Sequence, residues 1–227
     1  QFTAIRDGDE NWFTASSSGL SQSEIKAIEA TSLADVIKRN SSIEDLEENV
    51  FQASDDFIHG TDGDDVFSRG AGNDSLYGHG GNDKLMGSFG DDQLYGGDGH
   101  DKLYGGSGDD FLIGGDGNDL ITGGAGSDTI AGGNGADRFL FLNVSDSSAT
   151  GNQDLIFDFN GSEGDRIDLS AIQQGLSFIG SNLFSGKAGE VRFAAGELQA
   201  NTSGDQKADF AVTLAGVSSL QKDFLVL

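Results

Sequence analysis

The chain repeats itself every nine residues, nine times in succession, between residues 60 and 140. The clearest unit is residues 114–122, with the sequence GGDGNDLIT. A repeat this regular indicates a fold built from equal coils, and it limits the possible architectures more than any other feature of the chain. The units begin at Gly60, Arg69, Gly78, Gly87, Gly96, Gly105, Gly114, Gly123 and Gly132.

Three positions of the unit hold one kind of residue throughout. The fourth is always glycine, as expected where the backbone takes a positive φ: Gly63, Gly72, Gly81, Gly90, Gly99, Gly108, Gly117, Gly126 and Gly135. The sixth is always aspartate: Asp65, Asp74, Asp83, Asp92, Asp101, Asp110, Asp119, Asp128 and Asp137. The eighth is always a large apolar residue: Phe67, Leu76, Leu85, Leu94, Leu103, Leu112, Ile121, Ile130 and Phe139.

A single apolar residue between polar or small neighbours predicts a three-residue strand that points one side chain inward. Six turn residues and three strand residues then make half a coil, so eighteen residues complete one coil. Successive coils stack as parallel strands, and the eighth-position residues form a narrow core. The sequence therefore predicts an all-β fold whose main part is a parallel β-roll over residues 55–140.

The turns of this roll offer oxygen ligands. Aspartate carboxylates and the uncovered carbonyls of a glycine-rich backbone suit a hard cation of the size of Ca²⁺. Turns on one edge belong to units two apart, so nine units predict about seven sandwiched ions. The alternative is that Gly and Asp only favour turns. A turn does not need aspartate at the same place nine times, whereas a row of ions does.

The repeat resembles the RTX, or hemolysin-type, calcium-binding nonapeptide. The resemblance implies that Ca²⁺ is held by carbonyls of the turn glycines and by the sixth-position aspartates, each carboxylate being shared between neighbouring ions. The early units depart from the pattern, since Arg69 replaces the first glycine and Thr61, His79 and Ser88 replace the second. The strongest sites are therefore expected from Gly96 onward.

The chain beyond the repeat resembles the region that follows the roll in serralysin-type secreted metalloproteases of the peptidase M10 family. The matching segments are residues 136–142, 154–159, 164–170, 183–193 and 208–214. They predict antiparallel strands that cap the end of the roll over residues 141–227, with a short helix at residues 170–174. By the same resemblance, Asp154, Asp158, Asp165 and Asp168 are candidates for further ions, the alternative being solvated loop acids. The last five residues, DFLVL, resemble the terminus that type I exporters recognise in this family.

Two weaker patterns add candidate ligands. Asn201, Ser203, Asp205, Lys207 and Asp209 stand at alternate places of an EF-hand-like loop, but the loop lacks the expected glycine and the final glutamate, so a plain hairpin is the alternative. Residues 51–59 resemble a degenerate leading half-coil, with Asp56 and Ile58 in register.

Residues 1–54 form the remaining part, an N-terminal cap or the remnant of an upstream domain. Ser21, Ser32 and Ser42 precede short apolar patterns and predict short helices. The chain begins with Gln1 rather than Met, so we expect a fragment or a processed product.

The chain carries a formal charge of −25, with 38 acidic and 13 basic residues. Such a surface disfavours nucleic acid as a partner. No apolar run approaches the length of a transmembrane helix, so we expect no membrane insertion. Without bound cations the chain should be expanded by self-repulsion, so that folding and calcium binding are one event outside the cell.

No catalytic motif is present. The zinc motif His-Glu-x-x-His of serralysins is missing, and His59, His79 and His100 are spaced by twenty and twenty-one residues, which matches no zinc signature. We therefore expect a non-catalytic, secreted calcium-binding module that serves export by the type I secretion machinery and calcium-triggered folding. One alternative is the C-terminal part of a secreted enzyme, either a serralysin-like protease or a polysaccharide-active enzyme. The other is an adhesin or glycan-binding module that uses Tyr77, Tyr95 and Tyr104.

Overall fold

The computed structural model describes residues 2–6, 12–16 and 54–227. At the N-terminus, β1 (Phe2–Arg6) and β2 (Trp12–Ser16) pair as an antiparallel two-stranded sheet, which the sequence patterns did not predict. The short helices expected after Ser21, Ser32 and Ser42 lie outside the described residues.

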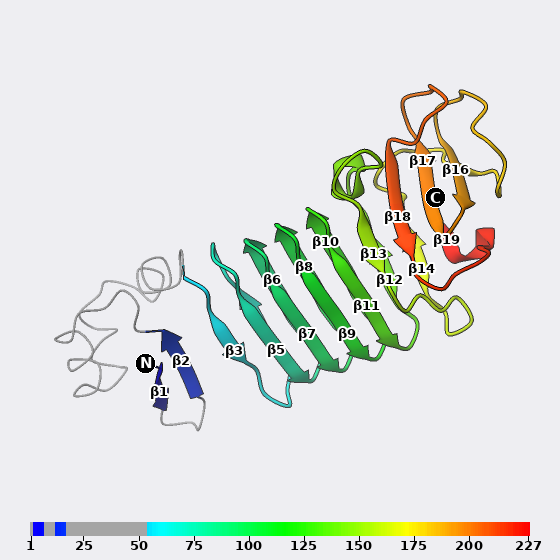
Figure 1. Cartoon of the computed structure of the whole chain (residues 1–227). Helices are drawn as coiled ribbons and strands as arrows, with labels where there is room; N and C mark the ends of the chain where they lie inside the picture. The colour runs from blue at the N-terminus through cyan, green and yellow to red at the C-terminus, as the bar shows by residue number, and fades with distance from the viewer. Residues whose placement is uncertain (1, 7–11, 17–53) are drawn as a thin grey trace.

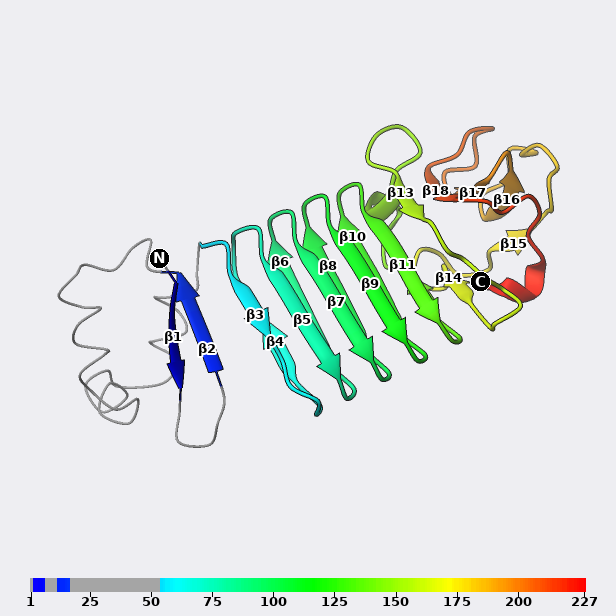
Figure 2. The same ribbon diagram turned by 60° about the horizontal axis from the view of Figure 1, so that its bottom comes forward.

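From residue 57 to residue 168 the strands alternate between two sheets that form the two walls of a rod (Figure 1). Figure 2 shows the turns that join the walls along both edges of the rod. One wall begins with β3 (Phe57–His59), β5 (Ser75–Gly80), β7 (Gln93–Asp98), β9 (Phe111–Asp116) and β11 (Thr129–Asn134). The other begins with β4 (Val66–Ser68), β6 (Lys84–Phe89), β8 (Lys102–Ser107), β10 (Leu120–Ala125) and β12 (Arg138–Leu140).

Neighbouring strands of each wall are parallel, and their partners are eighteen residues apart. Leu76 lies opposite Leu94 in one wall, and Leu85 lies opposite Leu103 in the other. The predicted coil of eighteen residues and the predicted parallel β-roll are therefore confirmed. The leading half-coil is confirmed as well, since Ile58 of β3 pairs with Leu76.

The predicted division of the unit into turn and strand is wrong. Strands β5 to β11 are six residues long and the turns between them only three, because the first three positions of each unit continue the pairing. Gly97, for example, lies opposite His79 on one side and Gly115 on the other. Glycine has no side chain, so hydrophobic alternation cannot predict the part of a strand that consists of glycines.

The second and fourth positions of the unit impose positive φ angles. Eight of the nine fourth-position glycines have them, Gly63 being the exception to the prediction. At the second position, φ lies between 96° and 125° for the glycines from Gly97 to Gly133. His79 (φ 77°) and Ser88 (φ 86°) keep that conformation with a side chain present, which strains the backbone.

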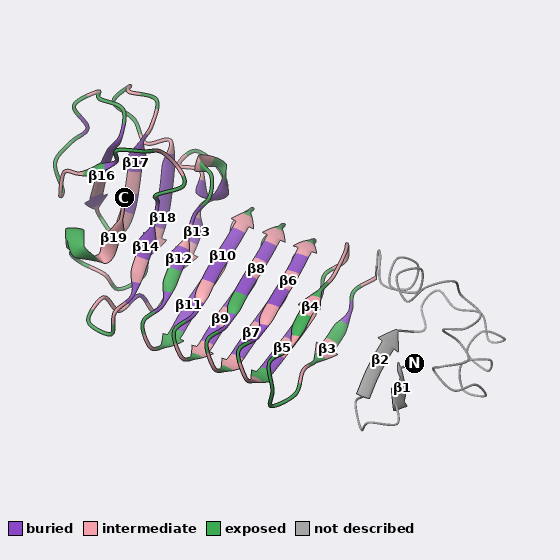
Figure 3. Ribbon diagram, turned by 180° about the vertical axis from the view of Figure 1, so that it is seen from behind, coloured by how far each residue is buried: buried purple, intermediate pink, exposed green. Residues whose placement is uncertain are grey.

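The eighth-position residues fill the interior, as predicted. All of them from Leu76 to Phe139 are buried, and Figure 3 shows buried residues in the middle of β6, β8 and β10. Only Phe67 of the first unit is partly covered. A one-residue row of apolar side chains per wall is a thin core, so turn chemistry must contribute to stability.

The roll continues past the nine units. β13 (Asp154–Ile156) pairs in parallel with β11, and β14 (Arg166–Asp168) pairs in parallel with β12. The prediction that these two segments are antiparallel cap strands is therefore wrong. Their partners are 26 and 28 residues away instead of eighteen, because inserted loops interrupt the repeat.

The cap itself is the antiparallel unit β16 (Glu190–Ala194), β17 (Glu197–Asn201) and β18 (Phe210–Leu214), flanked by the short strand β15 (Ser177–Phe178). β18 joins the roll beside β13, and β19 (Leu225–Val226) joins it beside β14. The 3-10 helices η1 (Val144–Ser147) and η2 (Lys222–Phe224) complete it. Residues 170–172 form a turn in place of the predicted short helix. Within the described residues no helix has the length and apolar character needed to cross a membrane.

Candidate metal centre

The sixth-position aspartates form two rows, one along each edge of the roll. In both rows the backbone N–H of one aspartate donates to Oδ1 of the aspartate one coil further on, as from Asp92 to Asp110 at 2.8 Å and from Asp101 to Asp119 at 2.8 Å. The first row consists of Asp56, Asp74, Asp92, Asp110, Asp128 and Asp154. The second row consists of Asp65, Asp83, Asp101, Asp119, Asp137 and Asp165.

The other carboxylate oxygen, Oδ2, has no hydrogen-bond partner in most of these aspartates, although it is buried. These side chains lie inside the turns, and those from Asp74 to Asp137 are at most 2% exposed. A buried, unpartnered carboxylate oxygen is costly, so ten of them along two lines need a common explanation. The ten are Asp56, Asp74, Asp83, Asp92, Asp101, Asp110, Asp119, Asp128, Asp137 and Asp154.

The unpartnered oxygens lie between coils, against the first-position glycines. A Cβ atom placed on Gly114 would lie 2.2 Å from Oδ2 of Asp119 and 2.5 Å from the carbonyl oxygen of Gly132 in the next coil. Gly96 and Gly105 show the same arrangement. The first glycine thus leaves room where carboxylate and carbonyl oxygens of two successive coils converge. The sequence interpretation assigned no role to this position, although eight of the nine units have glycine there.

These oxygens fit the predicted ligand. Ca²⁺ takes six to eight oxygen ligands from carboxylates and carbonyls, and here both kinds meet in a buried space where Oδ2 has no hydrogen-bond partner. The fourth-position glycines stack in the same way, since a Cβ on Gly117 would lie 1.6 Å from the carbonyl oxygen of Gly99. Their carbonyls therefore face the next coil, where the RTX resemblance implies that they act as ligands.

The ends of the rows differ from the middle. Oδ2 of Asp65 accepts hydrogen bonds from the N–H and hydroxyl of Thr61, and Oδ2 of Asp165 accepts the N–H of Asn160. At the start of the first row, Nε of Arg69 lies 3.9 Å from Oδ2 of Asp56, where the other units have only glycine. Hydrogen bonds from neighbouring groups thus satisfy Oδ2 of Asp65 and of Asp165, whereas Arg69 offsets the charge of Asp56 without a hydrogen bond to its Oδ2.

The four further acids divide into two kinds. Asp154 and Asp165 extend the two rows, and Oδ2 of Asp154 is among the unpartnered oxygens. Asp158 instead accepts the N–H groups of Gly132 and Gly133, and Asp168 pairs with the guanidinium of Arg138. The latter two therefore hold the end of the roll with hydrogen bonds and an ion pair.

The EF-hand-like segment is the loop of the hairpin between β17 and β18. Oδ2 of Asp209 accepts the N–H groups of Thr202 and Ser203, and Oδ1 of Asp205 accepts the N–H of Lys207. Asn201 bonds to Gly204 and Asp205 of the same loop. These contacts are those of the plain hairpin alternative, and the predicted ligation by Asn201, Asp205 and Asp209 stays a prediction.

The three tyrosines do not form one surface. Tyr77 and Tyr95 lie on one wall with their rings stacked at 4.7 Å and an interplanar angle of 2°, whereas Tyr104 belongs to β8 of the other wall. A sugar binds to the face of an aromatic ring, and here the faces of Tyr77 and Tyr95 cover each other. The stack is therefore a packing ladder between coils.

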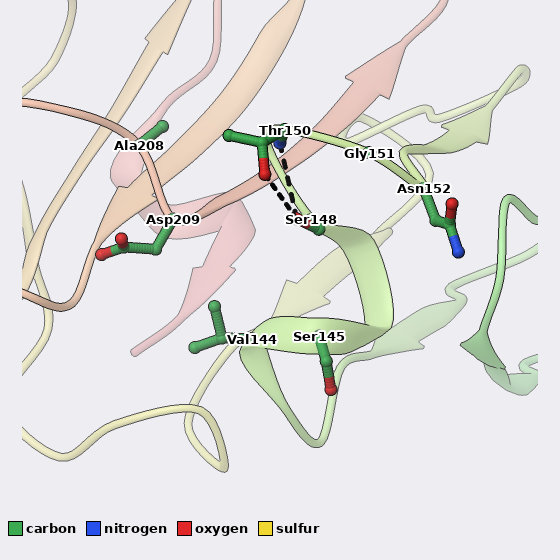
Figure 4. Close-up of a pocket in the computed structure, with 8 residues that line it drawn as sticks. All are labelled: Val144, Ser145, Ser148, Thr150, Gly151, Asn152, Ala208 and Asp209. Atoms are coloured by element: carbon green, nitrogen blue, oxygen red, sulfur yellow. Dashed lines mark hydrogen bonds between the residues drawn. The ribbon is translucent and has the colours of Figure 1, made fainter.

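An open hollow of about 720 Å³ lies between η1 and the loop before β18. Figure 4 shows Val144 and Ser145 on one side, Asp209 on the other, and Thr150 bonded to Ser148. Asp209 is the sole ionisable residue among the eight that line it. The residues that line the hollow therefore include neither a nucleophile with an adjacent base nor a pair of acids.

Comparison with known families agrees with the description of the roll and of the C-terminal part of the chain. Residues 52–76 and 77–112 match the RTX calcium-binding nonapeptide repeat. Residues 101–226, more than half of the chain, match the family described as peptidase M10 serralysin C terminal. The chain belongs to the serralysin C-terminal family. This serralysin C-terminal domain is thus a Ca²⁺-binding β-roll domain, and its two matched regions are of non-catalytic kinds found in secreted proteins.

Solved structures similar to this serralysin C-terminal domain include subunits of an epimerase and an extracellular lipase. The AlgE6R3 and AlgE6R2 subunits of the Azotobacter vinelandii mannuronan C5-epimerase are 30% and 28% identical, cover 78% and 75% of this chain and 81% and 91% of their own, and give TM-scores of 0.38 and 0.36. The extracellular lipase LipA from Serratia marcescens is 21% identical over 81% of this chain, with a TM-score of 0.33. This domain covers 42% of that lipase. No curated protein matches the chain.

Burial changes the acidity of the aspartate rows in this serralysin C-terminal domain. It raises the pKa of Asp110 and Asp154 to about 8 and that of Asp119 to about 7, and neighbouring aspartates add to the effect. Backbone N–H groups on Oδ1 act in the opposite direction but do not outweigh burial. The charged forms of Asp110 and Asp154 are thus disfavoured at neutral pH unless a cation neutralises them.

We expect calcium affinity to rise with pH. A carboxyl whose pKa is raised by folding stabilises the metal-free roll fully below its unfolded pKa of 3.8, and this contribution is lost as the pH rises through about 6 to 8. A bound cation replaces those protons, so binding at pH 7 should release protons. Calorimetry in two buffers with different protonation enthalpies counts them. Equal heats in both buffers would contradict the prediction.

Proposed function

We propose that this domain is a non-catalytic, calcium-folded module of a secreted bacterial protein, which directs that protein through the type I secretion machinery and folds outside the cell. The observation that carries the proposal is the pair of aspartate rows with ten buried, unpartnered carboxylate oxygens. A bound Ca²⁺ supplies the positive charge and the coordination that these oxygens lack.

The two carboxylate oxygens of each aspartate and the first-position glycines have different roles. Oδ1 of each aspartate holds the backbone of the previous coil, and Oδ2 is left for an ion between coils. The first-position glycines, such as Gly114, keep the space open. We propose about seven sandwiched ions, with the fourth-position glycine carbonyls among their ligands.

Low cytosolic calcium would then keep the chain unfolded inside the cell, and calcium outside would fold it. The roll has few residues that stabilise it without ions, since its core is one apolar side chain per half-coil and the charge of the chain is −25. Chains of high net charge and low hydrophobicity remain expanded. An expanded chain is also the form that can pass through an export channel.

The proposed export signal supports this order of events. Residues 223–226 are part of η2 and β19 in the folded domain, where Leu225 pairs with Ile167 and Phe224 packs near Phe159. A secretion machinery that reads this segment as an extended peptide has to read it before the cap folds. The signal is thus fully accessible in the unfolded chain, and its apolar residues are half-buried after export.

Export can be tested in cells that carry a type I exporter of the serralysin class. The full chain is expected in the medium, and a variant that lacks residues 223–227 is expected to stay inside the cells, because the exporter loses its signal. Purified samples of both must show calcium-dependent β structure, so that retention is not the result of a folding defect. Equal export of the two chains would contradict the proposed signal.

The parent protein is a second part of the proposal. The serralysin C-terminal match favours a secreted enzyme whose catalytic domain precedes this chain, of the serralysin-like metalloprotease kind. A polysaccharide-active parent would use the same module in the same way. In both cases the module contributes export and calcium-dependent stability, and the catalytic residues belong to another part of the protein.

A further inference from the structure

Two of the three histidines of the chain meet on the outer face of the roll. His59 is the last residue of β3 and lies opposite Tyr77 of β5, and His79 is two residues further along β5 on the same face. Nδ1 of His59 lies 2.8 Å from Nε2 of His79. Figure 1 and Figure 2 show β3 and β5 side by side near the start of the roll.

The neighbouring aromatic rings hold His59 in place. The ring of Tyr77 stacks on it with 4.7 Å between centroids and an interplanar angle of 15°, and Tyr95 stacks on Tyr77 in turn. The two imidazoles are nearly parallel, at 19°, with 5.0 Å between their centroids. Both histidines are exposed, so the pair of nitrogens is open to solvent.

His79 occupies a position that later units fill with glycine. Its φ of 77° lies in the left-handed region, which strains the backbone of a residue with a side chain. Ser88 tolerates the same conformation, so strain alone shows no function. What distinguishes His79 is the second imidazole that its side chain reaches.

We propose that His59 and His79 form a binding site for a divalent transition-metal ion such as Cu²⁺ or Ni²⁺, separate from the calcium rows. Imidazole nitrogen is a preferred ligand of these ions, whereas Ca²⁺ prefers oxygen. With metal–nitrogen bonds of about 2.0–2.1 Å, two ligands at right angles lie about 2.9 Å apart, and tetrahedral ligands about 3.3 Å apart. The observed 2.8 Å therefore fits square-planar or octahedral ions better than tetrahedral Zn²⁺.

In the metal-free pair the two nitrogens point at each other across the shared hydrogen. On binding, the donating imidazole moves its proton to its other ring nitrogen by tautomer exchange. Both exposed rings then turn so that their lone pairs meet at an ion beside the line that joins the two nitrogens. Water completes the coordination, because the described residues bring no third His, Cys, Asp or Glu to this pair.

The test is a Cu²⁺ titration of the full chain in excess Ca²⁺, which keeps the aspartate rows occupied. Calorimetry is expected to show one Cu²⁺ site per chain, and electron paramagnetic resonance is expected to show two coupled nitrogens. Absence of nitrogen coupling, or a stoichiometry that grows without saturation, would overturn the proposal.

Three variants separate this site from unspecific binding. H79G removes one ligand and restores the glycine of the repeat, so it should fold at least as well as the parent chain while losing at least about tenfold in Cu²⁺ affinity. H59Q should show the same loss. The matched control is H100N, because Nδ1 of His100 accepts the N–H of Asn118 and an asparagine oxygen fills that role at Asn82.

Each outcome of the variants decides one point. Unchanged Cu²⁺ binding in H79G, or an equal loss in H100N, would show that the pair is not the site. Calcium-dependent circular dichroism of the same samples reports the roll itself, so a failed copper site leaves the calcium proposal standing. The reverse also holds, because loss of the calcium response would concern the aspartate rows rather than the two histidines.

Discussion

Removal of calcium from the full chain is expected to abolish the β-roll. Each buried Oδ2 atom without a partner costs about 1–3 kcal/mol when no ion is bound, which is a large part of the roughly 5–15 kcal/mol by which a whole domain is stable. The roll has only one apolar residue per half-coil to offset this cost. Far-UV circular dichroism during a titration with a chelator should show a cooperative loss of β signal, with full recovery when calcium is returned.

Two controls sharpen this result. Mg²⁺ should not restore the signal, since it demands a small octahedral site and gives up its water reluctantly. The substitution D110N should raise the calcium concentration at the folding midpoint, and its neighbour D109N should not. Both remove one negative charge, but Asp110 is buried with a free Oδ2, whereas Asp109 is exposed and its Oδ1 only accepts the N–H of Ser127. A β signal that persists in chelator would contradict the folding role.

The repeat period made most of the roll predictable. Once the coil is known to be eighteen residues long, the strand register within the nine units follows from it, and so do the burial of the eighth positions from Leu76 to Phe139 and the alignment of the repeat aspartates in two rows. Asp154 and Asp165 could have been placed too, because Asp154-Leu155-Ile156 and Asp165-Arg166-Ile167 repeat the order aspartate, any residue, apolar residue. The inserted loops hid this match by breaking the period.

Other features could not be obtained from side-chain patterns. The glycine half of each strand pairs through its backbone alone, so its six-residue length left no hydrophobic signal. The contact between His59 and His79 was present in the spacing, since twenty residues are one coil plus two and place both on one face. That arithmetic becomes meaningful only after the parallel register of β3 and β5 is known.

The substitution G117A is expected to destabilise the roll as strongly as the loss of the calcium ion proposed beside Gly117. Gly117 has a φ of 140°, and a Cβ there would lie 1.6 Å from the carbonyl oxygen and 2.6 Å from the carbonyl carbon of Gly99. Both are backbone atoms of the previous coil, so relief requires the coils to separate. Backbone strain and overpacking together should cost about 2–6 kcal/mol in calcium-saturated protein, measured by urea unfolding.

The matched control is G151A, which adds the same methyl group where no atom lies within 4 Å. Gly151 follows η1 in an exposed turn and has no positive φ, so its free energy of unfolding should change by less than about 0.5 kcal/mol. Because the carbonyl of Gly99 is among the proposed calcium ligands, G117A should also raise the calcium concentration needed for folding. Equal urea midpoints for the two variants would mean that the coils are not in the close contact on which the calcium sites depend.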